Sequence, residues 1–232
     1  MIEVHVGHAG TRPDWGSSGF RTWSYGDYRL LVDVRIPLAG KTHSAHYCAM
    51  IENFFSEAFD TPTGRMHIIT DEEQRLRATD WENKGDRMLQ WLRAHYGEDG
   101  FRLGETRAPS APRLALEAYF EGQVAAIESV RTLARGTEFQ LLVWSALREI
   151  PVGSTLSYGL LAAKIGRPAA VRAVGAANGA NPIPVVVPCH RVIGADSSLT
   201  GFGGGLERKR WLLAHERTHA APSVPYNLEL RI

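Results

Sequence analysis

Short apolar runs separated by turn residues dominate the chain between residues 54 and 81. The runs cover residues 54–59, 66–70 and 76–81. The first two are joined by Thr61-Pro62-Thr63-Gly64, and the last two by an acidic turn at 71–73. Proline, glycine and aspartate between short apolar segments are typical of tight connections between neighbouring strands. The pattern therefore predicts an antiparallel sheet.

Helical periodicity replaces this pattern farther along the chain. Apolar residues recur at the spacing of one helix face at Met88, Leu89, Trp91, Leu92 and Tyr96. The prolines of segment 108–112 interrupt the chain, and a second helix is expected around residues 114–120. Strands followed by these helices predict a small α/β domain over residues 50–133.

A second, mainly helical domain is expected over residues 134–217. Its first helix is predicted from Thr137 to Glu149, because Thr137 and Gln140 have the spacing of a capping box. Four apolar residues then share one face, namely Phe139, Val143, Leu147 and Ile150. Pro151 ends the helix.

Two short helices with a tight connection come next. Ser157 can cap a helix over residues 158–165, and Gly166-Arg167-Pro168 separates it from a helix over residues 169–178. This spacing fits a helix-turn-helix, although an ordinary pair of antiparallel helices has it too. The second helix is rich in Ala and Gly, so its backbone can lie close either to another helix or to nucleic acid.

The two ends of the chain carry less information. Residues 1–49 are rich in Gly, Ser, His and Trp, and they hold one alternating run that predicts a strand, formed by Leu30, Val32, Val34 and Ile36. We interpret residues 1–49 as an N-terminal extension of unknown role. Residues 218–232 are interpreted as a C-terminal tail.

Composition places the chain among globular proteins. Its 232 residues are 44% hydrophobic and 22% charged, and none of its apolar runs has the length of a membrane span. The N-terminus lacks the pattern of a secretory leader, which predicts a cytoplasmic protein. The net charge of +1 conceals a basic region at 153–216, with seven Lys and Arg against three acidic residues. Such a region suits contacts with phosphate groups.

Cys189 has the clearest chemistry. With two cysteines in the chain no disulfide framework is expected, and a cysteine among polar partners can be present for its reactivity. It follows residues 185–187, three valines that predict a short buried strand or extended segment, and Pro188 fixes the backbone before it. A reactive thiol needs a base or a positive charge nearby, and His190 and Arg191 offer both. A buried, inert cysteine is the alternative on this dipeptide alone.

The segment Pro188-Cys189-His190-Arg191-Val192 resembles the active-site signature of the O6-alkylguanine-DNA alkyltransferases. The resemblance extends over roughly 80 residues of the C-terminal half. It includes Phe139, Trp144, Tyr158, Arg172 to Gly175, Asn181-Pro182, Gly204-Gly205 and Trp211 to Glu216. It implies a ribonuclease H-like α/β domain with an antiparallel sheet, followed by a winged helix-turn-helix domain. It also implies a monomer that repairs double-stranded DNA without a cofactor.

The resemblance further implies a nucleophile, a base and an orienting acid. Cys189 would attack the alkyl carbon, His190 would accept its proton through a water, and Glu216 would orient His190. Tyr158 would donate a proton to the leaving guanine, and Asn181 would brace the turn before the cysteine. The sulfur would keep the alkyl group, so each molecule would react once. O6-alkylguanine is the expected lesion, and O4-alkylthymine is a second candidate.

A base stacked in a duplex has to be extruded before it can react. By the same resemblance, Arg172 would enter the vacated place from the minor groove, while Ala170, Ala173 and Gly175 would lie against the DNA backbone. Arg191 is also expected to contact DNA. The wall of the base pocket is expected to comprise Pro184, Val192, Phe202 and Gly203. The last two stand where some relatives have Tyr and Ser.

Three alternatives compete with this interpretation. A module that flips alkylated bases without repairing them, as alkyltransferase-like proteins do, would lack the reactive cysteine that this chain retains. A Cys–His hydrolase would need an oxyanion hole and would have no use for Arg172. His43, His46 and Cys48 are potential zinc ligands, but their spacing fits no common structural zinc site, so no metal is expected.

Overall fold

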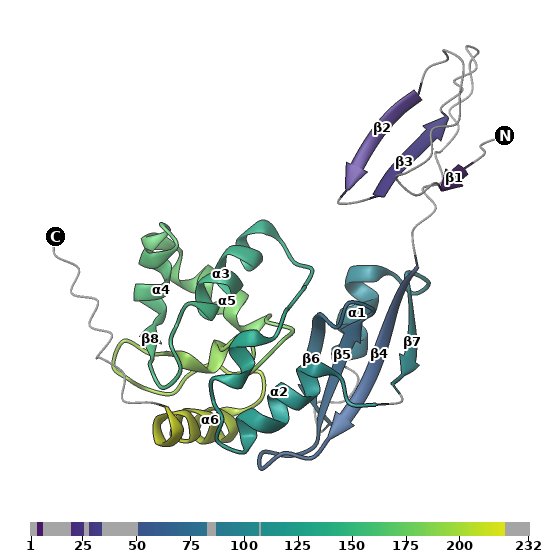
Figure 1. Ribbon diagram of the computed structural model, residues 1–232. Coiled ribbons are helices and arrows are strands. Elements are labelled where there is room, and N and C mark those ends of the chain that lie inside the picture. Colours follow the sequence, from purple (N-terminus) through teal and green to yellow (C-terminus); the bar gives the residue numbers. More distant parts are fainter. Residues whose placement is uncertain are drawn as a thin grey trace. The chain divides into compact units, whose positions relative to one another are not determined.

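The computed structural model describes residues 4–6, 20–25, 28–33, 51–82, 87–106 and 108–220 (Figure 1). The chain divides into two compact units, Met1–Cys48 and Ala49–Ile232. Among the described residues, no helix combines the length and the apolar character that a membrane crossing requires.

The first unit contains a three-stranded antiparallel sheet. Its strands are β1 (Val4–Val6), β2 (Phe20–Tyr25) and β3 (Tyr28–Asp33), in the order β1-β3-β2. The strand predicted from the alternating run is confirmed for Leu30 and Val32, which lie in β3. The rest of that run lies outside the described residues.

The second unit is built on a four-stranded sheet. Its strands are β4 (Glu52–Phe59), β5 (Met66–Asp71), β6 (Leu76–Trp81) and β7 (Phe101–Glu105), in the order β6-β5-β4-β7. The pairs β4/β5 and β5/β6 are antiparallel, as predicted. The prediction of a wholly antiparallel sheet was wrong at one edge, because β7 pairs parallel to β4. This edge strand is short and largely exposed, and with Phe101 and Leu103 as its only apolar residues it has too few for a strand pattern to stand out in the sequence.

Helices cover both faces of this sheet. Successive side chains of a strand point to opposite faces. Thus Ile69 packs with Leu92 of α1 (Arg87–Tyr96), whereas its neighbour Ile68 shares a core with Leu116 of α2 (Ala111–Phe120). Burial on both faces explains why β5 reads as an almost continuous apolar run.

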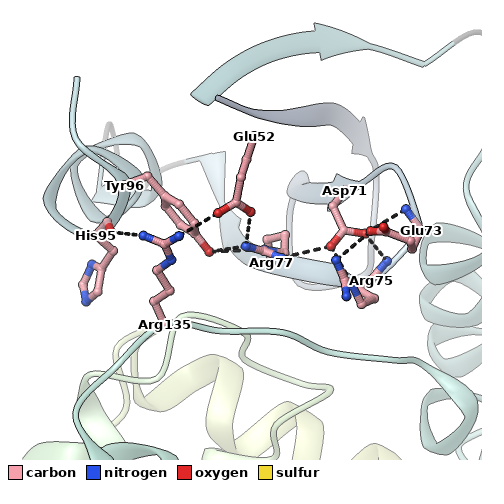
Figure 2. A network of polar contacts seen from close by, with 8 residues as sticks. All are labelled: Glu52, Asp71, Glu73, Arg75, Arg77, His95, Tyr96 and Arg135. Atoms are coloured by element: carbon pink, nitrogen blue, oxygen red, sulfur yellow. Dashed lines mark hydrogen bonds and ion pairs between the residues drawn. The ribbon is translucent and has the colours of Figure 1, made fainter. Parts of the chain in front are cut away.

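A buried polar network joins the strands to α1 (Figure 2). Arg77 donates to Asp71 at 3.0 Å, to Glu52 at 2.5 Å and to the hydroxyl of Tyr96 at 2.7 Å. Arg135, which precedes the helix at Glu138–Arg148, donates to the second oxygen of Glu52 at 2.7 Å. Its guanidinium lies 4.1 Å from the centre of the Tyr96 ring. The network therefore ties β4, β5, β6 and α1 to the chain that leads into the helical half.

The helices of this half begin where their caps predict. In α3 (Glu138–Arg148) Thr137 and Gln140 form both hydrogen bonds of a capping box, which confirms that prediction. Ser157 caps α4 (Tyr158–Lys164) by accepting from the backbone N–H of Leu160. The helix predicted at 169–178 starts with a 3₁₀ turn, Pro168–Ala170, and continues as α5 (Val171–Gly179).

The second unit also contains several short elements and a C-terminal helix. They are a 3₁₀ turn at Ala126–Ser129, the parallel pair β8 (Leu156–Ser157) and β9 (Val192–Ile193), and α6 (Leu206–His219). The larger of two hydrophobic clusters among the described residues joins the sheet to the helical half and includes Ile68 of the sheet, Trp144 of α3 and Leu212 of α6, while the smaller one lies between the sheet and α1. The boundary at 133/134 between two domains stays a prediction.

Candidate active site around Cys189

Cys189 begins a 3₁₀ turn, Cys189–Arg191, that leads into β9. The residue is only 4% exposed. Burial raises the pKa of its thiol to about 11, although Asn181 and Lys209 act in the opposite direction. A thiol with this pKa is protonated at neutral pH. Any nucleophilic use of the sulfur therefore requires a route for its proton.

The chain approaches the cysteine through a tight turn. Asn181 donates its amide to Val187 O at 2.8 Å and accepts from the backbone N–H of Ile183 at 3.0 Å. Val185 has a φ of 76°, which a β-branched residue rarely adopts. The valines are buried as predicted, but the strand or extended segment predicted for 185–187 was wrong. The neighbouring prolines lack the N–H groups of a strand ladder, and the Asn181 side chain closes the turn instead.

His190 and Glu216 form a fully buried pair. His190 Nε2 lies 2.8 Å from Glu216 Oε1, and neither side chain is exposed. Burial lowers the pKa of His190, although Glu216 opposes this shift, and the ring is thus neutral at neutral pH. Burial alone would raise the pKa of Glu216, but His190 and Arg191 hold it well below its ordinary value.

The second ring nitrogen of His190, Nδ1, makes no hydrogen bond within the described part of the chain. With Nε2 donating to Glu216, Nδ1 of the neutral His190 is an acceptor. Nδ1 is buried and has no hydrogen-bond partner in the described part of the chain. Because buried polar atoms are normally satisfied, such an atom indicates a place for a water or a reacting group.

Arg191 is not placed to contact DNA. It is 3% exposed, and its guanidinium donates to both oxygens of Glu216 at 2.9 Å and to Ile150 O at 2.6 Å. The prediction that Arg191 contacts DNA was therefore wrong, as was its assignment as a charge available to the thiol. Its charge is neutralised by Glu216.

Two further donors reach the same carboxylate. The hydroxyl of Tyr119, on α2, donates to Glu216 Oε1 at 2.9 Å, and the backbone N–H of Gly153 donates to Oε2 at 3.3 Å. Glu216 therefore accepts from groups on α2, on the loop before β8 and on the cysteine turn. This arrangement fixes the carboxylate from several sides.

Tyr158 and Asn178 also lie close to the cysteine turn. The Tyr158 hydroxyl is within 3.4 Å of Thr200 O and 3.3 Å of Gly201 O, and partial burial raises its pKa. Asn178 donates its amide to Cys189 O at 3.4 Å. The structure thus brings Tyr158 to the loop that follows β9, close to the cysteine.

The four residues expected to form a pocket wall lie on three segments, namely the Asn181 turn, β9 and the loop after β9. Pro184 is buried in the Asn181 turn and Val192 is buried in β9. The ring centre of Phe202 lies 6.4 Å from that of His190, and Gly203 O accepts from Arg87 at 3.3 Å. Phe202 and His190 are therefore neighbours, as a shared pocket requires.

Helix α5 has one buried and one exposed face. Val174, Ala177 and Asn178 are buried, whereas Arg172 and Ala173 are exposed. Ala170 and Gly175 are half-buried. Tight packing and an open small-residue surface are therefore both present, on opposite sides of the same helix.

The comparisons with known proteins agree with this geometry. The sequence model of the family described as 6-O-methylguanine DNA methyltransferase, DNA binding domain, matches residues 138–218. The methylated-DNA–protein-cysteine methyltransferase of Salmonella typhimurium is 51% identical over 160 residues, which cover 69% of this chain and 94% of the relative. This chain belongs to the methylated-DNA–protein-cysteine methyltransferase family.

Other members of the methyltransferase family are also similar. That of Mycolicibacterium paratuberculosis is 55% identical over 126 residues, covering 53% of this chain and 76% of the relative. The crystal structure of Mycobacterium tuberculosis O6-methylguanine methyltransferase matches with a TM-score of 0.60 and 38% identity, over 73% of this chain and 96% of that one. The structure of its complex with DNA matches with a TM-score of 0.57 and 37% identity, over the same shares.

Sequence reasoning missed Lys209 in this methyltransferase. Its ammonium group is buried and donates to Val192 O at 2.5 Å and to Thr200 O at 2.6 Å. Burial lowers the pKa of Lys209 to about 8, although Cys189 opposes the shift. Lys209 stands in a run of basic residues that resembles a solvated surface. Its spacing to Leu212 and Glu216, three and seven residues on, is the signal that places it on the inner face of α6.

The potential zinc ligands predicted from the sequence lie in the N-terminal part of the chain, away from Cys189 in the sequence. Among the described residues, no group of three His, Cys, Asp or Glu side chains is placed to hold a metal ion. His43, His46 and Cys48 lie outside the described residues.

Proposed function

We propose that this methyltransferase repairs DNA by transferring an alkyl group from O6 of guanine to Sγ of Cys189, once per molecule. The observation that carries the proposal is the buried thiol next to His190, whose Nε2 is held by Glu216 and whose Nδ1 has no partner among the described residues. A histidine whose Nε2 is fixed and whose Nδ1 is unoccupied is suited to act as a general base that removes the thiol proton.

The proton leaves the thiol through one water. This water bridges Sγ and His190 Nδ1, and the thiol proton passes to the imidazole as the sulfur attacks. The resulting imidazolium is stabilised by the ionised Glu216. The nearby charge of Lys209 favours the thiolate, which offsets part of the cost of ionising a thiol with a pKa of about 11.

The bond changes balance without a cofactor. The S–C bond forms as the C–O6 bond breaks, and the bonding electrons pass to guanine. Tyr158 protonates a ring nitrogen of the leaving base and regains its proton from the imidazolium through solvent. Its contacts with Thr200 and Gly201 are long, at 3.4 and 3.3 Å, so a guanine nitrogen can replace them. The thioether product has no good leaving group, which makes the transfer irreversible.

DNA binds along the exposed face of α5. Arg172 takes the place of the flipped nucleotide from the minor groove, and Ala170, Ala173 and Gly175 allow close approach of the backbone. The degenerate code of the minor groove suits a protein that must accept any flanking sequence. In this proposal the chain acts as a monomer, with a winged helix-turn-helix domain over 134–217 that contains α4 and α5. The ribonuclease H-like domain spans 50–133.

The flipped base lies between the Asn181 turn and the loop after β9. Pro184, Val192, Phe202 and Gly203 form its walls, and Asn181 braces the turn that carries the cysteine. Phe202 and Gly203 bring no side-chain hydroxyl to the pocket, so the alkylated oxygen is received by backbone N–H groups near Gly203. O4-alkylthymine has a similar exocyclic ether and is proposed as a second substrate.

A matched pair of proteins tests the proposal against lesion binding without repair. Wild type and Cys189→Ala are incubated with duplex DNA that carries one O6-methylguanine with a labelled methyl group. Label should move to wild-type protein and not to the variant, while both bind the duplex with similar affinity. Label transfer to Cys189→Ala would refute the assigned acceptor, and binding without transfer by wild type would favour a lesion-binding protein.

A further inference from the structure

Tyr119 reaches the reactive cluster from a distant part of the chain. It lies on α2, 97 residues before Glu216, yet its hydroxyl donates to Glu216 Oε1 at 2.9 Å. Both residues are completely buried. The same oxygen receives His190 Nε2 at 2.8 Å, so one carboxylate oxygen joins the tyrosine to the histidine.

We propose that Tyr119 is a positioning residue for alkyl transfer, because its hydroxyl holds Oε1 of Glu216 in line with Nε2 of His190. This inference rests on the function proposed above. The α/β part of the chain thereby contributes a side chain to the chemistry of the helical part.

The surroundings of Tyr119 fix the direction of its hydroxyl. Its ring packs edge-on against Phe120, with ring centres 5.3 Å apart, and against His215, also at 5.3 Å. His215 Nε2 lies 2.7 Å from Tyr119 O, which anchors the backbone to α6 as well. A side chain held at both its ring and its backbone can act as a rigid support for the carboxylate.

Tyr119 stays a neutral donor in this position. Burial raises its pKa well above the ordinary value, and the adjacent charge of Glu216 raises it further. The hydroxyl therefore keeps its proton across the working range of the protein. A permanent donor stabilises part of the negative charge on Oε1. His190 and Arg191 contact the same oxygen.

The charged and titratable groups that face this pair come from three elements. They are Tyr119 of α2, Cys189 and Arg191 of the cysteine turn, and Lys209 and His215 of α6. Of these side chains, Tyr119 is the one that can lose its hydrogen-bonding group, by substitution with Phe, with little change in shape or charge. Its removal isolates the effect of one hydrogen bond on the His190–Glu216 pair.

Tyr119→Phe should slow alkyl transfer and shift its pH dependence. Without the hydroxyl, Oε1 attracts the histidine proton more strongly and is less firmly fixed, so His190 becomes protonated at higher pH. The single-turnover rate constant at neutral pH should fall about tenfold, with both duplex O6-methylguanine and free O6-benzylguanine. The rise of the rate with pH should move to higher pH.

Tyr96→Phe provides the matched control. Tyr96 is also a buried tyrosine of the α/β part, and its hydroxyl accepts from Arg77 in a network that does not include Glu216 (Figure 2). Rates and pH profiles are measured for wild type, Tyr119→Phe and Tyr96→Phe. Thermal unfolding is followed in parallel. Tyr96→Phe should keep the wild-type rate constant and pH profile.

The outcomes separate positioning from simple stability. A slower Tyr119→Phe with a displaced pH profile, next to an unchanged Tyr96→Phe, supports the proposal. A wild-type rate in Tyr119→Phe overturns it, and so does a loss of rate with an unchanged pH profile. Wild-type protein that gains no alkyl group would instead overturn the proposed function itself, so the two failures are distinguishable.

Discussion

The second unit contains two buried polar networks with the same ingredients and different properties. One joins Arg77 to Asp71, to Glu52 and to the Tyr96 hydroxyl (Figure 2). The other joins Arg191 to Glu216, which also accepts from the Tyr119 hydroxyl. Each network thus contains a buried arginine, at least one carboxylate and a tyrosine hydroxyl, but the hydroxyl accepts from the arginine in the first and donates to the carboxylate in the second.

The difference between them is one unoccupied atom beside a nucleophile. In the Glu216 network His190 Nδ1 has no partner within the described ranges, and the preceding residue in the chain is the buried Cys189. A saturated network can only stabilise, whereas one with an open acceptor can take up a proton. The open acceptor position, rather than the buried ion pair, therefore distinguishes a reactive cluster from a structural one.

The largest effect should follow from Glu216→Gln. The change removes the charge that stabilises the His190 imidazolium and leaves Arg191 buried without a counterion. We expect the rate constant of alkyl transfer to fall by about a thousandfold, which is within the range for loss of acid–base catalysis. Single-turnover transfer from duplex O6-methylguanine measures it.

Asp71→Asn is the corresponding change in the other network. It removes a carboxylate that accepts from Arg77 at 3.0 Å and from Arg75 at 2.7 Å. Breaking a buried ion pair costs about 3–5 kcal/mol of unfolding free energy, so urea unfolding should show a clear loss. The folded variant should transfer alkyl groups at the wild-type rate. Equal losses of rate in both variants would erase the distinction between the two networks.

A smaller effect, confined to duplex DNA, is expected from Arg172→Ala. Because Arg172 is exposed on α5, its removal should leave stability and the reaction with free O6-benzylguanine unchanged. Transfer from duplex DNA should slow by about ten- to a hundredfold, the equivalent of the few kcal/mol that unstacking costs. The control is Arg210→Ala, an exposed arginine of α6 paired with Glu207 at 2.6 Å. Equal losses on both substrates would contradict a role in base flipping.

The smallest effect concerns the pH dependence of stability. Burial lowers the pKa of His190 in the folded protein. The unfolded chain therefore binds the proton more readily, and the free energy of unfolding should decrease as pH falls through the ordinary histidine pKa of about 6.5. His190→Gln should weaken this dependence in urea unfolding at several pH values. An identical dependence in the variant would mean that His190 is not buried as a neutral ring.

Sequence patterns were informative where local chemistry decides the structure. The capping box of α3, the Ser157 cap of α4 and the three antiparallel strands were predicted because each depends on residues a few positions apart. The edge strand β7 was missed because it is short and exposed and has only two apolar residues, Phe101 and Leu103. Three consecutive valines predict a short strand or extended segment before Cys189, but the structure has a turn there, which the side chain of Asn181 closes.

Long-range contacts account for the remaining differences. The sequence places Arg191 among the expected DNA contacts, whereas Glu216 of α6 holds it inside the protein. Tyr119 and Lys209 gave no local signal that linked them to the cysteine. Their partners are 97 and 17 residues away, so their roles depend on how α2 and α6 pack.

Alkyl transfer to Cys189 is tested most directly by the intact mass of the protein after incubation with duplex DNA that carries one O6-methylguanine, followed by peptide mapping. We expect one methyl group for each protein molecule, located on the peptide that contains Cys189, and no further gain when more substrate is added. A methyl group on another residue, or repeated turnover with an unmodified Cys189, would contradict single alkyl transfer to Cys189.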